Sequence, residues 1–266
     1  MLLMALRALA LRLTTPAPAD IRALGLVGDA VALWSRATRR GGDWAPHEAR
    51  CHAIVDRAVE DLAQRRTVVV LGSGLCRDVP VERLAKTFAT VVLVDAVHLA
   101  PVRQRLAALQ NARFVTADLT GAGAWLAGEA TARADVLAPW RADDTVDLVI
   151  SANVLSQLAI GPEDYLDSHP ARAAALPAGL PDALIGAHLT DLAAFHCRVC
   201  LLTDVEMRKE TRAGKVVERM DLLGGHTLPA PDETWDWTVA PFGEIARDVA
   251  RIHRVHGYAD LKAARR

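Results

Sequence analysis

The sequence predicts an α/β fold, with a doubly wound, mostly parallel sheet and an N-terminal helical extension. From residue 67 onward, apolar runs rich in β-branched residues alternate with helical patterns, as in a parallel sheet with crossover helices. These runs are apolar throughout, which is typical of strands buried on both faces. The 266 residues are 52% hydrophobic and 24% charged, a globular composition large enough for a substantial core.

The helical extension is predicted over residues 1–60, and the sheet domain over residues 61–266. Residues 21–40 and 48–66 have helical periodicity, and the intervening GGDWAP predicts a turn between two helices. The first thirteen residues are apolar, but Arg7 and Arg12 interrupt them and no basic leader precedes them. We therefore expect a helix packed on the domain rather than a secretory signal.

The sheet domain begins with the strand TVVVLG and continues through alternating elements. Helical spacing of Val81, Leu84 and Phe88 predicts a helix that covers the sheet. Toward the C-terminus, WDWTVA predicts an aromatic strand, followed by a helix beginning near Gly243 and a closing strand. The predicted parallel strands lie within residues 67–72, 90–95, 112–119, 146–152 and 198–204.

Two longer stretches, residues 159–181 and 208–234, interrupt this alternation. Each follows a predicted strand, so each leaves the sheet at its carboxyl edge, where ligands bind in open α/β sheets. We expect both to cover that edge on the acceptor side of a site. The second contains GKVVERMDLLGG, which predicts a small hairpin.

Charge and cysteine content disfavour several classes of function. The 31 basic and 32 acidic side chains give a net charge of −1, so nucleic-acid binding is disfavoured, and no apolar run is long enough to predict a membrane segment. Four cysteines are too few for a disulfide framework, which favours a cytoplasmic location. Cys197 and Cys200 form one C-x-x-C in a predicted strand, which points them to opposite faces, so we expect no metal site.

The turn after the first strand contains Gly72 and Gly74, and a helix follows it. Glycines at this position let backbone N–H groups approach a ligand closely. The ligand is a phosphorylated nucleotide, S-adenosylmethionine or none. Arg77 occupies the place of the third small residue of a dinucleotide fingerprint, and Asp78 would repel a pyrophosphate. Asp78 is instead predicted to cap the following helix.

Three polar residues follow successive strands and are expected at the same crevice. Asp95, a little over twenty residues beyond the first glycine, has the position of a carboxylate that accepts ribose hydroxyls. Asp118 suits an adenine amino group, and Asn153 opens into the crevice. Each also has a structural alternative, because Asp and Asn are common as strand-end and helix-capping residues.

Together these residues resemble the class I S-adenosylmethionine-dependent methyltransferase family, which has a Rossmann-like sheet. The resemblance covers about residues 67–204 and implies S-adenosylmethionine as the cofactor. Val70 and Cys76 depart from the family, which usually has an acidic residue and a third glycine there. The resemblance implies that Gly72, Ser73 and Gly74 contact the methionine part of the cofactor, and that Asp95 contacts its ribose. It also implies that Asp118 and Leu119 contact the adenine, and that Ser151 to Asn153 form the floor below the sulfonium.

Methyl transfer to a small-molecule acceptor is the predicted reaction, and it needs alignment more than a dedicated catalytic group. The candidates for a general base are His98, His188, Asp204 and Glu206. Trp235, Trp237 and Phe242 belong either to the core or to a wall of the acceptor pocket. The alternatives are an inactive binding module of the same fold, which the two departures favour, and a nicotinamide-dependent oxidoreductase. The acceptor and the oligomeric state are left open.

Overall fold

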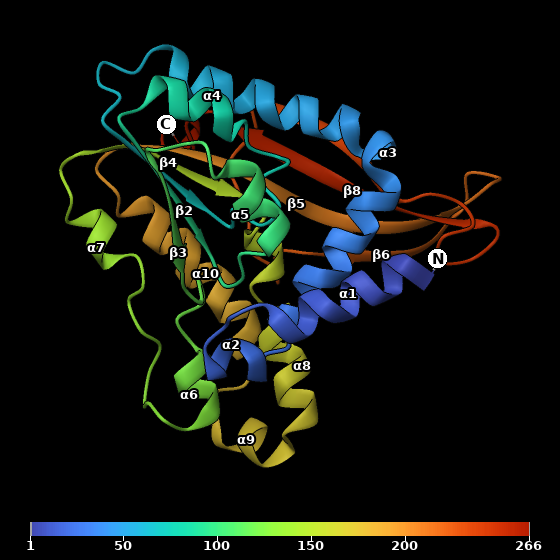
Figure 1. The fold of residues 1–266 in the computed structure, drawn as a ribbon. Coiled ribbons are helices and arrows are strands. Elements are labelled where there is room, and N and C mark those ends of the chain that lie inside the picture. Colours follow the sequence, from blue (N-terminus) through green and yellow to red (C-terminus); the bar gives the residue numbers. More distant parts are fainter. Residues whose placement is uncertain (1, 266) are drawn as a thin grey trace.

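The computed structural model describes residues 2–265 and contains one sheet of eight strands (Figure 1). Strands β1 to β5 run parallel in the order β3-β2-β1-β4-β5, and β8 and β7 continue the sheet antiparallel. The predicted doubly wound, mostly parallel Rossmann-like fold is therefore confirmed. The strands are β1 Thr67–Leu71, β2 Thr90–Asp95, β3 Ala112–Thr116, β4 Val146–Ala152, β5 Arg198–Thr211, β6 Val216–Asp221, β7 Glu233–Ala240 and β8 Val249–Tyr258.

Helices cover both faces of the parallel strands. On one face, Val68 and Val70 of β1 share a core with α3, α4 and α5. On the other face, Val69 and Leu71 pack in a second core with the 3-10 turn η1 and with α10. Every residue of β1 is buried, which explains why its sequence is apolar throughout. These elements are α3 Leu26–Glu60, α4 Val81–Thr87, α5 Ala100–Leu106, η1 Leu155–Gln157 and α10 Leu180–Ala193.

Most of residues 2–60 is helical, as predicted, but the turn expected at GGDWAP is wrong. Helix α3 runs without a break through that stretch for 35 residues and contains Pro46 in its interior. Tertiary packing explains this outcome, because Trp44 is buried and its indole Nε1 donates to the Val239 carbonyl at 3.2 Å. The two preceding helices are α1 Leu2–Thr14 and α2 Ala19–Ala23.

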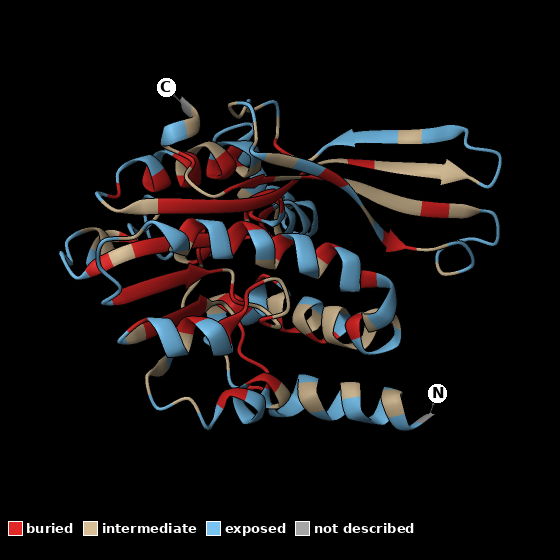
Figure 2. Ribbon diagram, turned by 90° about the horizontal axis from the view of Figure 1, so that it is seen from above, coloured by how far each residue is buried: buried red, intermediate tan, exposed pale blue. Residues whose placement is uncertain are grey.

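The far half of β5 extends beyond β4 and forms an antiparallel extension with β6, β7 and β8, which projects from the helix-covered body (Figure 2). The hairpin predicted within residues 208–234 is confirmed, because β6 pairs antiparallel with β5. The helix predicted near Gly243 is wrong, since β8 follows a turn there. Hydrogen bonding of β8 to two neighbouring strands outweighs its local helical spacing.

The remaining helices lie along the carboxyl edge and the second face of the sheet. Residues 159–181, predicted to be irregular, are mostly helical, with α8 and α9 followed after a short loop by α10 (Figure 1). Between residues 2 and 265, no helix has both the length and the apolar character that crossing a bilayer requires. The bounds are α6 Gly123–Ala127, α7 Ala138–Arg141, α8 Ile160–Ser168, α9 Pro170–Ala175 and the terminal 3-10 turn η2 Ala263–Arg265.

Candidate functional site

A crevice of about 540 Å³ opens at the carboxyl ends of β1, β2 and β4. The chain moves outward from β1 to β2 and β3 in one direction and from β4 to β5 in the other, so the crevice lies at the point where the strand order reverses. That point is the general ligand site of open α/β sheets. The volume is in the range typical of small-molecule sites.

The glycine turn after β1 lines the crevice and has a left-handed backbone at three residues. Gly72 and Gly74 have φ of +74° and +47°, and Cys76 also has a positive φ of +52°. A Cβ at Gly72 would stand 2.5 Å from the Val154 Cβ, whereas a Cβ at Gly74 would meet nothing closer than 3.8 Å. Gly72 is therefore required by close packing, while Gly74 leaves open space on the crevice side.

Asp95 at the end of β2 is held beside this turn by two backbone donors. Gly74 N–H donates to its Oδ2 at 2.7 Å, and Val97 N–H donates to its Oδ1 at 3.1 Å. Burial raises the pKa of this carboxyl, and the two hydrogen bonds oppose that rise. Each carboxylate oxygen keeps acceptor capacity toward the crevice, which Asp95 lines.

Asp118 also lines the crevice, but its carboxylate is engaged in the turn before α6. Its oxygens accept from the Thr120 N–H at 2.9 Å, the Thr120 hydroxyl at 2.7 Å and the Gly123 N–H at 2.9 Å. This is a side-chain-stabilised turn after the strand, in keeping with the strand-end role that the sequence offered as the structural alternative. Leu119, beside it, contributes an apolar wall.

Asn153 lies at the tip of β4 with a positive φ of +52° and lines the crevice. Its Nδ2 donates to Asp78 Oδ2 at 2.9 Å. Ser151 lies beneath the crevice instead of lining it, since it is fully buried and its hydroxyl is 3.1 Å from His188 Nε2. Asp78 was predicted to cap α4, and this is wrong: that helix has no side-chain cap at its N-terminus.

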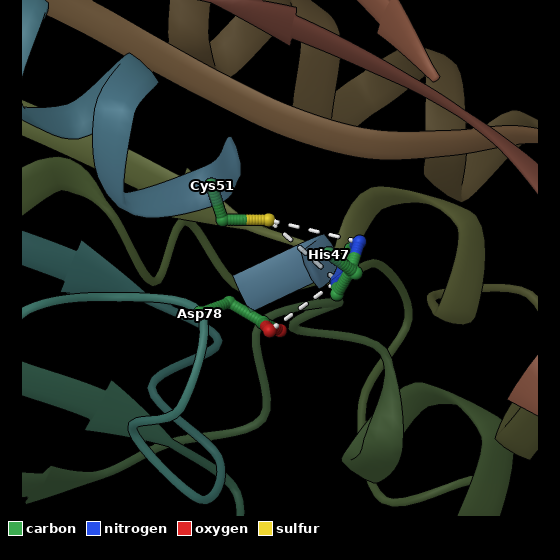
Figure 3. Close-up of side chains that lie close together, drawn as sticks. All are labelled: His47, Cys51 and Asp78. Carbon is green, nitrogen blue, oxygen red and sulfur yellow. Dashed lines mark hydrogen bonds and ion pairs between the residues drawn. The ribbon is translucent and has the colours of Figure 1, made fainter. Parts of the chain in front are cut away.

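Asp78 instead belongs to a buried polar cluster with His47 and Cys51 of α3 (Figure 3). His47 Nε2 lies 3.3 Å from Asp78 Oδ1, and Trp235 Nε1 donates to His47 Nδ1 at 3.0 Å. Burial raises the pKa of Asp78, but hydrogen bonds from His47 and Asn153 outweigh burial, and the pKa lies below its usual range. Asp78 is therefore a carboxylate at neutral pH, and it lines the crevice.

The ligand atoms of His47, Cys51 and Asp78 lie within 4.8 Å of one another, as in a metal site. The hydrogen bonds do not fit a metal. An indole N–H only donates, so the Nδ1 lone pair of His47 is used by Trp235, and the ring proton lies on Nε2. No lone pair of this imidazole is then free for an ion. Burial also raises the pKa of the Cys51 thiol well above its usual value. The cluster positions Asp78 rather than a cation.

Four buried polar atoms that line the crevice have no hydrogen-bond partner among the described residues. Buried groups of this kind cost free energy unless a ligand or solvent satisfies them. Their concentration in one crevice distinguishes it from the rest of the described chain. They are the Ser73 hydroxyl, Asn153 Oδ1, Trp237 Nε1 and Arg251 Nε.

None of the four residues suggested as a general base lines the crevice. His98 is buried, with Nε2 3.0 Å from the Val115 carbonyl, and burial lowers the pKa of His188 to about 4. Asp204 Oδ2 lies 2.7 Å from His253 Nδ1, and Glu206 pairs with Arg219 at 2.8 Å. Each has a structural partner that does not line the crevice.

The aromatic residues of β7 have different places. Trp237 lines the crevice and stacks on His47, with ring centroids 4.0 Å apart and planes 7° apart. Trp235 is buried beneath it, and Phe242 lies on the surface against Arg212. An aromatic wall therefore exists, and Trp237 provides it together with Trp44, whose ring meets it edge-on at 5.2 Å.

The two predicted covers differ in outcome. Residues 160–162 of the first segment line the crevice, whereas no residue of 208–234 does so. The chain covers the crevice instead with α3, through Leu33, Arg36 and Trp44, and with Arg251 of β8. Sequence reasoning missed these residues because they come from distant segments and follow no local motif. Arg77, which replaces the third small residue of a dinucleotide fingerprint, lines the crevice and pairs with Glu48 at 2.6 Å.

Comparisons with known proteins found similar solved structures but no similar sequences. No family model matches the sequence, and no match was found among curated proteins. DhpI in its complex with SAH is similar at 14% identity, with 88% of this chain and 95% of that chain covered and a TM-score of 0.41. A 1,6-didemethyltoxoflavin-N1-methyltransferase from Burkholderia thailandensis has 17% identity, 91% coverage of both chains and a TM-score of 0.40.

The N-methyltransferase NodS from Bradyrhizobium japonicum, in complex with S-adenosylhomocysteine, is similar at 11% identity. The match covers 78% of this chain and 85% of that chain, with a TM-score of 0.36. At these identities and scores, the neighbours do not identify the ligands of this chain. Its function has to be inferred from its own crevice.

Proposed function

We propose that the chain is an S-adenosylmethionine-dependent methyltransferase that acts on a small-molecule acceptor. The observation that carries the proposal is the pairing of Asp95 with Gly74. A carboxylate at the end of the second strand is fixed by the N–H of a glycine whose crevice side is open. This arrangement suits a ligand whose ribose lies beside the carboxylate and whose neighbouring part packs against the glycine turn.

The residues of the crevice fit the parts of this cofactor. Asp95 would accept the ribose hydroxyls, and Leu119 with Val97 would flank the adenine. Gly72, Ser73 and Gly74 would contact the methionine part, where the unpartnered Ser73 hydroxyl suits a polar group. Asp118 keeps its place beside the adenine in this proposal, although its turn already uses much of its acceptor capacity. When bound, the cofactor supplies an electrophilic methyl group on a sulfonium.

The proposed role of the chain is electrostatic and geometric. The negative charge of Asp78 stabilises a cationic ligand beside the glycine turn. Asp78, fixed by His47 and Asn153, also presents an acceptor to an O–H or N–H of the methyl acceptor and orients it. We propose it in place of the four base candidates from the sequence. The covering α3 and Trp237 limit water at the reacting end.

Titration calorimetry with S-adenosylhomocysteine tests the proposal. Asp95→Ala removes an acceptor of charge-assisted hydrogen bonds, each about 1.5 to 3 kcal/mol, so we expect affinity to fall by at least about tenfold. Asp56→Ala is the matched control, because Asp56 pairs with Arg83 on the surface at 2.9 Å, away from the crevice. Equal affinity of a folded Asp95→Ala chain and the wild type would remove the basis for the proposal.

A further inference from the structure

Arg251 of β8 differs from the basic residues around it on the antiparallel extension. Arg208 and Arg254 both bind Asp236, at 2.8 and 2.9 Å, and Lys209 pairs with Glu218 at 2.6 Å. Arg251 is half-buried, lines the crevice and forms no ion pair with any described residue. Its guanidinium is therefore a positive charge directed to the crevice side of the sheet without a protein counter-ion.

The Nε of Arg251 is buried and unpartnered, and so is the indole Nε1 of Trp237. The two side chains share one face of the sheet: Trp237 pairs with His253 of β8, and Arg251 lies two residues before that partner. Both groups donate hydrogen bonds and accept none. A ligand that satisfies them must present acceptor atoms, and beside a guanidinium an oxyanion is stabilised most.

The ring of Trp237 links Arg251 to the reacting end of the crevice. Its ring stacks on His47, and His47 bonds to Asp78 beside the glycine turn. Leu33 and Trp44 add apolar and aromatic surface along the same wall, and Arg36 also lines the crevice but pairs with Glu244 at 3.6 Å. The wall thus has a carboxylate at one end, an aromatic middle and a guanidinium at the other.

We infer that the methyl acceptor is a small organic acid whose carboxylate or phosphate binds Arg251 and Trp237. Its apolar or aromatic body lies along Trp237, and its O–H or N–H group faces Asp78. This inference rests on the methyl transfer proposed above and adds the chemical class of the acceptor. Carboxylate and phosphate acceptors of this class share an oxyanion at a fixed distance from a hydrogen-bond donor.

The test measures acceptor binding by calorimetry in the presence of saturating S-adenosylhomocysteine. The probes are 4-hydroxybenzoate, 4-hydroxyphenyl phosphate and the neutral 4-hydroxybenzamide, which all keep the hydroxyl that would face Asp78. We expect the wild type to bind at least one of the two acids about tenfold or more tightly than the amide, because a charge-assisted bond to Arg251 is lost in the amide. The stronger of the two acids identifies the oxyanion as carboxylate or phosphate.

Arg251→Gln should abolish the preference for the acid over the amide. Trp237→Phe should weaken binding of the acid, because it removes the indole N–H but keeps an aromatic ring. Arg254→Gln is the matched control on the same strand, because Arg254 pairs with Asp236 and does not line the crevice. Arg251→Lys, which keeps the charge without the planar fork, should retain part of the preference and serves if the glutamine variant does not fold.

The outcomes separate the two claims. If the wild type does not bind S-adenosylhomocysteine, the proposed methyl transfer fails, and this inference with it. If S-adenosylhomocysteine binds but neither acid binds better than the amide, only the acid acceptor is overturned. The same holds if the acid preference survives in a folded Arg251→Gln chain.

Discussion

Alanine substitution at the two glycines of the turn should separate folding from ligand binding. Gly72→Ala places a Cβ 2.5 Å from the Val154 Cβ and 3.0 Å from the Ala152 carbonyl oxygen, at a φ of +74°. A left-handed backbone costs an alanine about 1 to 2 kcal/mol, and overpacking adds roughly 1 to 3 kcal/mol. We therefore expect Gly72→Ala to lower the free energy of unfolding by about 2 to 5 kcal/mol.

Gly74→Ala has the same cost of a left-handed backbone but causes no steric clash. Its Cβ would lie 3.8 Å from the Gly72 carbonyl oxygen and 3.9 Å from Asp95 Oδ2, so only about 1 to 2 kcal/mol of stability should be lost. The added methyl occupies the crevice beside Asp95, so affinity for S-adenosylhomocysteine should fall by at least about tenfold.

Urea unfolding of both variants and calorimetry of the folded ones check this pair. Gly72→Ala should show the larger stability loss, and Gly74→Ala should show lost binding in a folded protein. The reasoning is refuted if Gly72→Ala is as stable as the wild type, or if Gly74→Ala binds S-adenosylhomocysteine unchanged.

Two further predictions concern buried groups outside the proposed ligand contacts. His188 has a pKa of about 4 against 6.5 in the unfolded chain, so the unfolded state binds the extra proton and stability should fall by up to ~3 kcal/mol as pH drops from 6.5 to 4. Urea unfolding of His188→Gln across that range should show a smaller loss, and an identical pH profile would contradict the assignment. Trp235→Phe leaves the buried His47 Nδ1 without its donor, so unfolding should become easier by about 1 to 3 kcal/mol. A thermal midpoint equal to that of the wild type would show that this hydrogen bond does not matter.

The local sequence was sufficient to predict the parallel strands, because each of them is an apolar run bounded by turns. β1 and β4 are buried along nearly their whole length, so periodicity and burial agree. The same reasoning failed at α3. Two glycines and Pro46 predict a turn locally, but burial of Trp44 against β7 keeps the helix continuous.

In the candidate site, too, some residues could be predicted from the local sequence and others could not. Gly72, Gly74 and Asp95 follow strands at known offsets, so the sequence places them at one edge of the sheet. Asp78 owes its position to His47 and Trp235, which are remote from it along the chain, and no local pattern indicates that contact. The four base candidates were chosen by residue type, and each has another partner. His98, His188 and Asp204 are buried and hydrogen-bonded, and Glu206 forms an ion pair with the exposed Arg219.

The central claim is that the crevice beside the glycine turn binds S-adenosylmethionine rather than a dinucleotide. Calorimetry of the wild-type chain with S-adenosylhomocysteine and, separately, with NAD tests it most directly. We predict saturable binding of S-adenosylhomocysteine at one site per chain and no binding of NAD, because Arg77 replaces the third small residue and Asp78 is negatively charged there. Binding of NAD without binding of S-adenosylhomocysteine would contradict the claim.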